Sequence, residues 1–172
     1  MDVSKVGYGS KAPEVINVII ECPKGSNNKY EFDKELGIVK LDRVLFSSVF
    51  YPGDYGFIPN TLCEDGDPAD AIFLSTNAFH PGVLVEGRPI AVMHMLDKGE
   101  KDDKILCVPK DDPRFAHVKD IKDVPQHTLD EIANFFSTYK LLEKKKVEVL
   151  GWKGAAEAKQ IIKDAIALYK KQ

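Results

Sequence analysis

The sequence has no long apolar run. Its first twenty residues lack a basic start and contain no apolar run longer than residues 18–20, so neither a signal peptide nor a membrane anchor is expected there. No other segment approaches the ~20 apolar residues that a membrane-spanning helix needs. We therefore expect a cytoplasmic protein.

Cysteine is also scarce. Cys22, Cys63 and Cys107 are an odd number of thiols and include no C-x-x-C pair. That pattern argues against a disulfide framework and against a zinc knuckle. Buried free thiols are the expected interpretation, and the sequence assigns these residues no further role.

The chain also has no excess of positive charge. The chain has 24 Lys and Arg against 27 Asp and Glu, a net charge of −3. A protein that coats a polyphosphate backbone needs the opposite sign, so nucleic-acid binding would require a local basic face. The motifs G-x-x-x-x-G-K-[ST], G-x-S-x-G and H-E-x-x-H do not occur, which disfavours nucleotide switches, serine hydrolases and zincins.

The composition that is present suits one compact domain. The 172 residues are 44% apolar and 30% charged, enough for a core and a solvated surface. Short segments rich in Val, Ile, Tyr and Phe predict strands. These segments are residues 15–22, 29–33, 38–41, 71–75, 89–96, 104–108 and 147–150. In 29–33, Tyr30 and Phe32 alternate with polar residues, so one face of that strand is polar.

Two later segments have the helical period. The first begins at a capping-box pattern, Thr128 and Glu131, and the second covers residues 155–169. The expected apolar stripe of the first helix is Leu129, Ile132, Ala133, Phe136 and Leu142. Many short strands followed by two helices predict an α+β fold, a small antiparallel β-barrel with helices packed outside.

Acidic residues gather in a loop that precedes a predicted strand. Asp65, Asp67 and Asp70 lie within six residues, with Gly66 allowing a tight path and Pro68 stiffening it. Carboxylates held together without His or Cys suit Mg²⁺, Mn²⁺ or Ca²⁺. The alternative is that Asp, Gly and Pro are here only because turns use them. The EF-hand register fails, because the fifth and sixth positions from Asp65 are not Asn or Asp and Gly.

A second acidic group follows another predicted strand. Asp97 and Asp102 come after residues 90–93, with Lys104 close behind. Alone, this pattern is typical of a solvated hairpin turn. Two Asp-rich loops at strand ends make one shared metal site more plausible than either loop does alone.

The segment DGDPADA at 65–71 resembles the signature of the soluble family I inorganic pyrophosphatases in their short bacterial-type form. The resemblance extends over about residues 16–152, in order and at family-like spacings. The other matching residues are Glu21, Lys29, Tyr30, Glu31, Asp42, Arg43, Phe50, Tyr51, Pro52, Tyr55, Gly56, Arg88, Pro89, Asp97, Asp102, Lys104, Phe135, Phe136, Tyr139 and Lys140. The resemblance implies a single pyrophosphatase domain over 1–172, built on a five-stranded barrel with helices outside.

The resemblance also implies roles for individual residues. It makes Asp67 the general base, and the metal ligands Asp65, Asp70, Asp97 and Asp102. The residues that would hold the phosphates are Lys29, Arg43, Tyr55, Lys104, Tyr139 and Lys140, and the supporting residues are Glu21, Glu31 and Tyr51. The implied reaction is Mg²⁺-dependent hydrolysis of pyrophosphate to two orthophosphates by direct attack of a metal-activated water.

The charges of this residue set agree with a metal requirement. Seven carboxylates against four Lys and Arg side chains leave a charge of −3 when all are ionised. Such a site should repel pyrophosphate unless divalent cations bind first or arrive with the substrate.

Two other functions remain open at this stage. One is a non-enzymatic small-barrel module for single-stranded nucleic acid, with residues 144–146 (KKK) beside Phe135 and Phe136 as its patch. The other is a catalytically silent calcium-binding protein. The resemblance further implies a homohexamer, pyrophosphate as the substrate, and neither nucleic acid nor a membrane as a partner.

Overall fold

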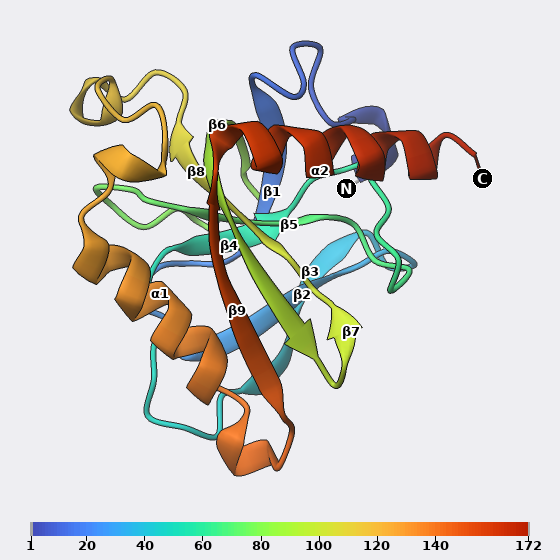
Figure 1. Cartoon of the computed structure of the whole chain (residues 1–172). Coiled ribbons are helices and arrows are strands. Elements are labelled where there is room, and N and C mark those ends of the chain that lie inside the picture. Colours follow the sequence, from blue (N-terminus) through green and yellow to red (C-terminus); the bar gives the residue numbers. More distant parts are fainter. Residues whose placement is uncertain (1, 172) are drawn as a thin grey trace.

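The computed structural model describes residues 2–171 and has an α+β fold (Figure 1). Its strands are β1 (Ile16–Cys22), β2 (Asn28–Asp33), β3 (Ile38–Val44), β4 (Asp54–Phe57), β5 (Asp70–Phe73), β6 (Leu84–Asp97), β7 (Glu100–Lys101), β8 (Lys104–Pro109) and β9 (Val147–Gly154). The helices are α1 (Gln126–Thr138) and α2 (Ala155–Tyr169), with short 3-10 turns η1 (Val3–Lys5), η2 (Pro113–Phe115), η3 (Ile121–Asp123) and η4 (Leu141–Glu143).

Five strands close into a ring. β1 pairs with β4 and with β6, and the circle runs through β4–β5, β5–β8 and β8–β6. This confirms the predicted five-stranded barrel. One pair differs from the expected antiparallel arrangement, because β5 and β8 are parallel. Parallel neighbours need a long connection, and β6 with β7 supplies it between these two strands.

Strand β6 extends beyond the ring. It is longer than the predicted 89–96, and its far end pairs with β7 and β9. The register shifts between Pro89 and Ala91, which suits a proline because it has no N–H to donate to the ladder.

The hairpin formed by β2 and β3 is a separate two-stranded sheet. Side-chain contacts attach it to the ring. Glu21 of β1 accepts a hydrogen bond from the Phe32 backbone N–H at 2.7 Å, and the Tyr30 N–H donates to the Cys22 sulfur at 3.2 Å. The position of this hairpin therefore depends on residues outside its own ladder.

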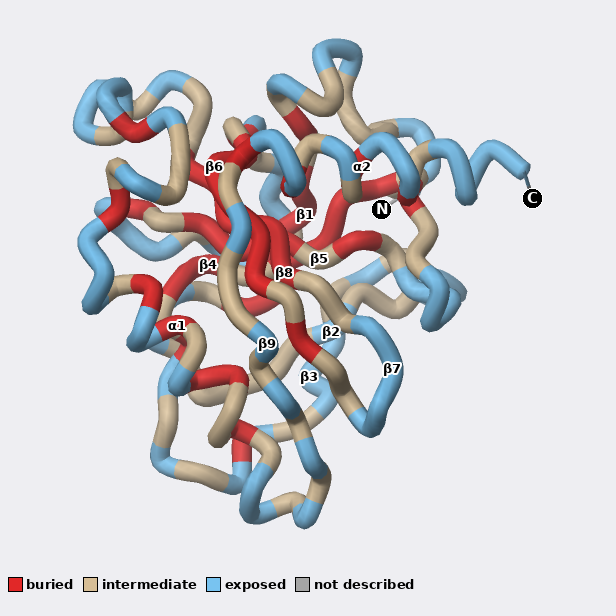
Figure 2. The backbone as a smooth tube through the Cα atoms, viewed as in Figure 1, coloured by how far each residue is buried: buried red, intermediate tan, exposed pale blue. Residues whose placement is uncertain are grey.

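Each helix covers one side of the ring (Figure 1). Residues of β5 alternate between the two sides: Ile72 packs in a cluster with α1, while Ala71 and Phe73 pack in a cluster with α2. β8 alternates in the same way. Figure 2 shows the resulting concentration of buried backbone in β1, β5, β6 and β8. Because these strands are buried on both faces, their sequences contain continuous apolar runs rather than alternating apolar and polar residues.

The helix predictions are partly confirmed. α2 has the predicted bounds 155–169, and Ala158, Ile162 and Ala165 are buried. The predicted capping box at the start of α1 is wrong. The helix begins at Gln126, two residues before Thr128, and the Thr128 N–H donates to the Pro125 carbonyl. The prediction that Leu142 belongs to the core is also wrong. It lies beyond the end of α1 and is exposed.

The thiols are free, with Cys22 and Cys107 buried and Cys63 partly buried. No helix within residues 2–171 has the length and apolar character needed to cross a membrane.

Candidate active site

The acidic loop connects β4 to β5 and is fixed by its own backbone. The Cys63 N–H donates to the Asp67 carbonyl at 2.7 Å, and the Asp67 N–H donates to the Asp65 carboxylate at 3.0 Å. Gly66 has a φ of +89°, which a side chain would disfavour. The buried hydroxyl of Thr61 accepts the Ala69 N–H at 2.9 Å. These contacts fix the backbone of the loop before any ligand binds.

Strand pairing places a lysine beside the end of this loop. Asp70 begins β5 and Lys104 begins β8, and the two residues are register partners in the parallel pair. The Lys104 ammonium donates to Asp70 at 2.5 Å and also to Asp102. Burial acts to lower the pKa of Lys104, but the charges of Asp70 and Asp102 outweigh burial and hold that pKa above its ordinary value. Lys104 is therefore a charged, fixed group.

One aromatic side chain, Tyr55, completes this group. The Tyr55 hydroxyl donates to the same Asp70 oxygen at 2.5 Å, and the Lys104 ammonium lies 5.7 Å from the centre of the Tyr55 ring. Burial, then the charges of Asp70 and Asp102, hold the pKa of Tyr55 well above its ordinary range. Tyr55 thus remains a neutral hydrogen-bond donor.

The segment after α1 brings a second pair of groups. Lys140 donates a hydrogen bond to Asp97, at the end of β6. Tyr139 stacks on Phe135 with ring centres 5.3 Å apart, and burial raises the pKa of its hydroxyl above the ordinary value. Because β6 and the end of α1 are far apart in sequence, only the fold brings these residues together.

The hairpin supplies a third cluster. Lys29 of β2 forms an ion pair with Glu31 and lies 3.7 Å from Asp42 of β3. Arg43 donates to Asp42 and, through Nε, to Glu143 at 2.8 Å. Lys29 and Arg43 therefore share the Asp42 carboxylate.

These three groups and the acidic loop surround one cavity of about 390 Å³. All the predicted site residues line it except Arg43 and Tyr51. Arg43 is joined through Asp42 to Lys29, which lines the cavity, and Tyr51 is buried, with its ring centre 5.7 Å from that of Tyr55. Further lining residues that the sequence analysis did not identify are Phe32, Lys34, Phe57, Pro68, Lys98 and Glu100. Lys34 lies in an exposed turn and Glu100 begins the exposed two-residue strand β7, and no sequence signal separates them from ordinary surface residues.

Burial, with nearby negative charge as a smaller cause, raises the pKa of several carboxyl groups in the cavity. Burial, together with the nearby charge of Asp70, raises the pKa of Glu21 to about 8. The pKa of Asp65 is raised by burial and by Asp102 and Asp67. Burial raises the pKa of Asp102. The charge of Lys104 opposes this shift, and the charge of Asp70 adds to it. Bringing these groups together therefore costs free energy that a bound cation would offset.

The donor set fits a hard divalent cation. Among residues 2–171, no group of three or more Asp, Glu, His or Cys side chains is arranged to hold a metal ion. Instead, Lys104 bonds to Asp70 and Asp102, and Lys140 bonds to Asp97. However, Oδ1 of Asp97 is buried without a hydrogen-bond partner. An orphaned carboxylate oxygen at an oxygen-rich cavity is a ready ligand for Mg²⁺.

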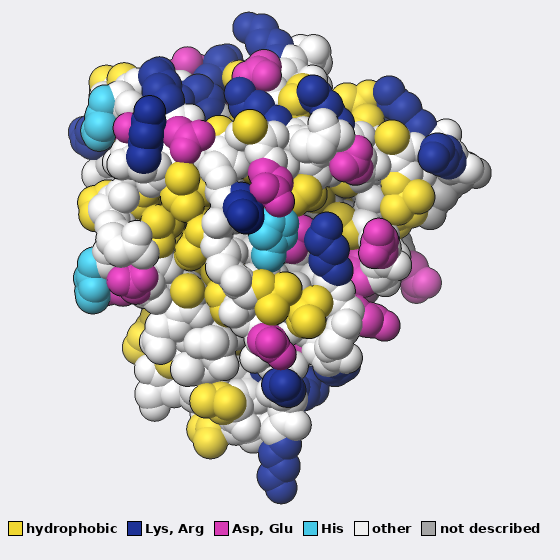
Figure 3. Space-filling view, in the orientation of Figure 1, with side chains coloured by type: hydrophobic (Ala, Val, Ile, Leu, Met, Phe, Trp, Pro, Cys, Tyr) yellow, Lys and Arg dark blue, Asp and Glu magenta, His cyan; other side chains and the backbone are white. Residues whose placement is uncertain are grey.

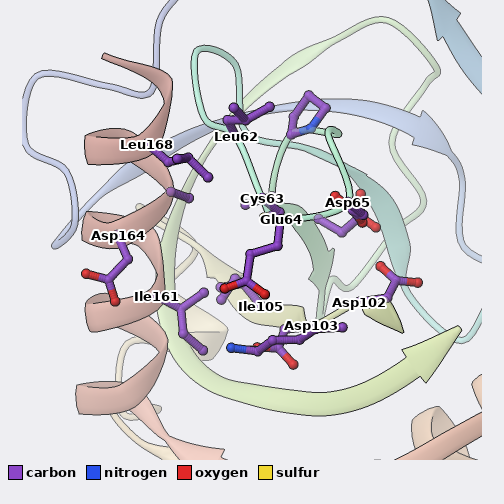
Figure 4. Close-up of a pocket in the computed structure, with 15 residues that line it drawn as sticks. Leu62, Cys63, Glu64, Asp65, Asp102, Asp103, Ile105, Ile161, Asp164 and Leu168 are labelled. Atoms are coloured by element: carbon purple, nitrogen blue, oxygen red, sulfur yellow. The ribbon is translucent and has the colours of Figure 1, made fainter. Parts of the chain in front are cut away.

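A smaller neighbouring cavity of about 160 Å³ lies between this loop and α2 (Figure 4). Figure 4 shows Glu64 and Asp103 between Ile161 of α2 and Asp102. Lys101 is the only basic residue in its lining, which also includes Asp164. An anionic ligand would be repelled there, so the larger cavity is the better phosphate site.

The hypothesis that Phe135 and Phe136 form part of a nucleic-acid-binding patch is wrong. Phe135 and Phe136 are buried in the core under α1, so they cannot stack on bases. On the face seen in Figure 3, Lys and Arg side chains are interspersed with Asp and Glu.

Comparisons with known proteins give a consistent answer. The family model described as inorganic pyrophosphatase matches residues 18–170. The inorganic pyrophosphatase of Synechocystis is 51% identical over 170 residues, which cover 99% of this chain and 100% of the relative. That of Haloferax volcanii is 52% identical over 162 residues, covering 94% and 92%. The crystal structure of inorganic pyrophosphatase from Thermus thermophilus is similar at a TM-score of 0.96, with 47% identity and 99% of both chains covered.

Proposed function

Since this chain belongs to the soluble family I inorganic pyrophosphatases and is an inorganic diphosphatase, we propose that it hydrolyses pyrophosphate with Mg²⁺ as its cofactor. The observation that carries the proposal is the cavity itself. Within a chain of this family, two acidic loops and three sets of cationic or phenolic groups meet around about 390 Å³ of space. The products are two orthophosphates.

The residues that would hold the metal are Asp65, Asp70, Asp97 and Asp102. Their oxygens are the ligand type that Mg²⁺ prefers, and the unpartnered oxygen of Asp97 supports the assignment. When bound, Mg²⁺ supplies positive charge to phosphate oxygens and lowers the pKa of a bound water. Glu21 and Glu31 support this group from the cavity wall.

Cationic and phenolic side chains bind the two phosphates. Lys29, Lys104 and Lys140 face the cavity as charged donors, and Tyr55 and Tyr139 add neutral O–H donors. Arg43 reaches the same anion from the edge, and the buried ring of Tyr51 supports Tyr55. Positive groups fixed before the reaction stabilise the charge that develops on the leaving phosphate without reorganising.

Asp67 is the proposed general base. Its side chain is 78% exposed at the cavity wall, and its backbone N–H is tied to Asp65. The only charged partner found for its carboxylate among residues 2–171 is Lys34, at 3.9 Å. Asp67 can therefore accept a proton from the attacking water while the loop keeps its shape. No covalent intermediate is required.

We further propose that the protein is cytoplasmic and assembles as a homohexamer. The family resemblance is the main support, and large exposed apolar side chains such as Phe46 and Phe50 suit an interface between copies. Sedimentation at low micromolar concentration should show a species far heavier than the 19.2 kDa chain. An active 19.2 kDa species would contradict an obligate hexamer.

The direct test is orthophosphate release from pyrophosphate. Release should require Mg²⁺, stop with a chelator, and be absent with a phosphomonoester. Oligonucleotide retention without phosphate release, or binding of Ca²⁺ with no turnover in Mg²⁺, would contradict the proposal.

A further inference from the structure

A buried carboxylate connects the hairpin to the segment after α1. Glu143 is the last residue of η4, and its side chain is only 4% exposed. One of its oxygens accepts the Nε–H of Arg43 at 2.8 Å, across 100 residues of sequence. The other accepts a hydrogen bond from Lys145 at 2.8 Å. Both oxygens of Glu143 are therefore used.

These contacts fix the plane of the Arg43 guanidinium. Nε bonds to Glu143 and Nη1 bonds to Asp42, so carboxylates from two different elements hold two of its three nitrogens. Within residues 2–171 no partner is found for Nη2. A planar guanidinium held in this way presents its remaining donors in one direction, which is how arginine recognises a phosphate.

Arg43 lies on a hairpin that is attached to the ring by side-chain contacts. Its strand, β3, belongs to the two-stranded sheet, which among residues 2–171 shares no backbone ladder with the ring. Glu143, in contrast, sits on the turn that directly follows Lys140. The Glu143 and Lys145 backbone N–H groups both donate to the Lys140 carbonyl, at 3.0 and 3.3 Å. One turn thus connects Arg43 to the element that carries Lys140.

Ionisation of Glu143 is consistent with this arrangement. Burial acts to raise the pKa of Glu143, but the hydrogen bonds from Lys145 and Arg43 outweigh it and hold that pKa below its ordinary value. Glu143 does not line the cavity, and a carboxylate whose two oxygens are already bonded to Arg43 and Lys145 has nothing with which to bind a phosphate.

We propose that Glu143 is a positioning residue for phosphate binding: it orients Arg43 relative to Lys140 so that both act on one pyrophosphate. The inference rests on the proposed role of Arg43 in holding a phosphate. We assign Arg43, at the edge of the site, to ground-state binding and leave the stabilisation of transition-state charge to the lysines that line the cavity, so misorientation of Arg43 should appear mainly in KM.

The test compares Glu143→Gln with wild type, using magnesium pyrophosphate at saturating Mg²⁺. Glu143→Gln keeps the size of the side chain and removes its charge. KM should rise about tenfold, with kcat within about threefold and little change in Tm, since a misplaced Arg43 loses its charge-assisted hydrogen bond to the phosphate, which is worth roughly tenfold or more in affinity. If Glu143→Gln does not fold, Glu143→Asp serves in its place.

Two control variants separate orientation from general structure. Glu148→Gln removes an exposed carboxylate whose partner is Lys146, 3.3 Å away, and should leave KM unchanged. Lys145→Met removes the other partner of Glu143 while leaving Arg43 bonded, and should change KM less than about twofold. A KM rise in Lys145→Met equal to that in Glu143→Gln would overturn the inference.

The decisive measurement is the double variant with Arg43→Ala. If Glu143 acts through Arg43, adding Glu143→Gln to Arg43→Ala changes KM by less than about twofold. Additive effects, a wild-type KM in Arg43→Ala, or a fall in Tm without a KM change in Glu143→Gln would each overturn it. Lack of pyrophosphate hydrolysis by the wild type would instead refute the proposed function, so the two failures are distinct.

Discussion

Asp67 and Asp70 occupy one loop but have different surroundings. Asp67 is exposed at the cavity, whereas Asp70 accepts hydrogen bonds from Tyr55 and Lys104. We expect Asp67→Asn to lower kcat by roughly 10²–10⁴-fold at neutral pH, because an amide cannot accept the proton. The measurement is orthophosphate release over a range of Mg²⁺ concentrations, and added Mg²⁺ should not restore the rate.

Asp70→Asn provides the contrast. It removes a proposed charged ligand, so Mg²⁺ affinity should fall and activity should recover partly at high Mg²⁺. Asp111→Asn, at an 82% exposed side chain, is the matched control and should behave as wild type. If Asp67→Asn stays within about threefold of wild type at saturating Mg²⁺, Asp67 is not the general base.

Glu21 makes the metal-free protein sensitive to pH. Because burial raises its pKa to about 8 in the folded state, from 4.5, the folded protein binds this proton more tightly than the unfolded chain. Its contribution to stability is complete below about pH 4.5 and is lost as pH rises towards 8. Glu21→Gln keeps an acceptor for the Phe32 N–H and carries no charge. We expect it to raise Tm at pH 8.5 by at least about 3 °C, measured in chelator.

The same variant should show little change in Tm at pH 4.5, where the carboxyl of the folded wild type, with its pKa of about 8, is already almost completely protonated. An equal rise in Tm at both pH values would show that the effect is packing rather than ionisation.

At the scale of elements, the close pairing of β1 with β4 leaves no room for a side chain at position 56, which is Gly56. A Cβ at Gly56 would lie 1.9 Å from the Ile19 carbonyl oxygen, which is backbone and cannot move aside. Gly56→Ala should therefore cost about 3 kcal/mol or more, lowering Tm by roughly 6–12 °C. Activity should fall too, because β4 carries Tyr55 and leads into the acidic loop. Thermal melting with parallel activity assays tests this.

Gly25→Ala is the comparison. Gly25 has a φ of +80° and nothing within 4 Å of a Cβ, so the cost should be about 1 kcal/mol of backbone strain. Equal losses in the two variants would mean that the close approach of β1 and β4 is not what requires Gly56.

For the whole molecule, the concentration of carboxylates around one cavity predicts stabilisation by Mg²⁺. An unfolded chain disperses these charges, so divalent cations should bind the folded state preferentially. At 100-fold over Kd, one site adds ~2.7 kcal/mol, equivalent to a rise in Tm of roughly 5–10 °C. Melting at constant ionic strength with and without millimolar Mg²⁺ measures it. Asp70→Asn should show a smaller rise, and no rise in the wild type would contradict a convergent metal site.

The sequence alone determined the features that depend on local pattern. The helical period set the bounds of α2, the apolar runs located most strands, and the spacing of Asp, Gly and Pro identified the loop at 65–70. It missed β4 and β7, since the first contains a glycine and a charged residue and the second has only two residues. The capping box failed because α1 begins directly after Pro125, so Thr128 lies inside the first turn, where its N–H donates to the Pro125 carbonyl.

Only the tertiary structure decided which of these groups meet. The parallel register of β5 and β8 places Lys104 between Asp70 and Asp102, and packing under α1 buries Phe135 and Phe136 instead of exposing them. The contact between Arg43 and Glu143 spans 100 residues and has no local signature. Periodicity reports how a segment pairs with its immediate neighbours, whereas ion pairs across elements follow from ring closure and helix packing, which no local pattern encodes.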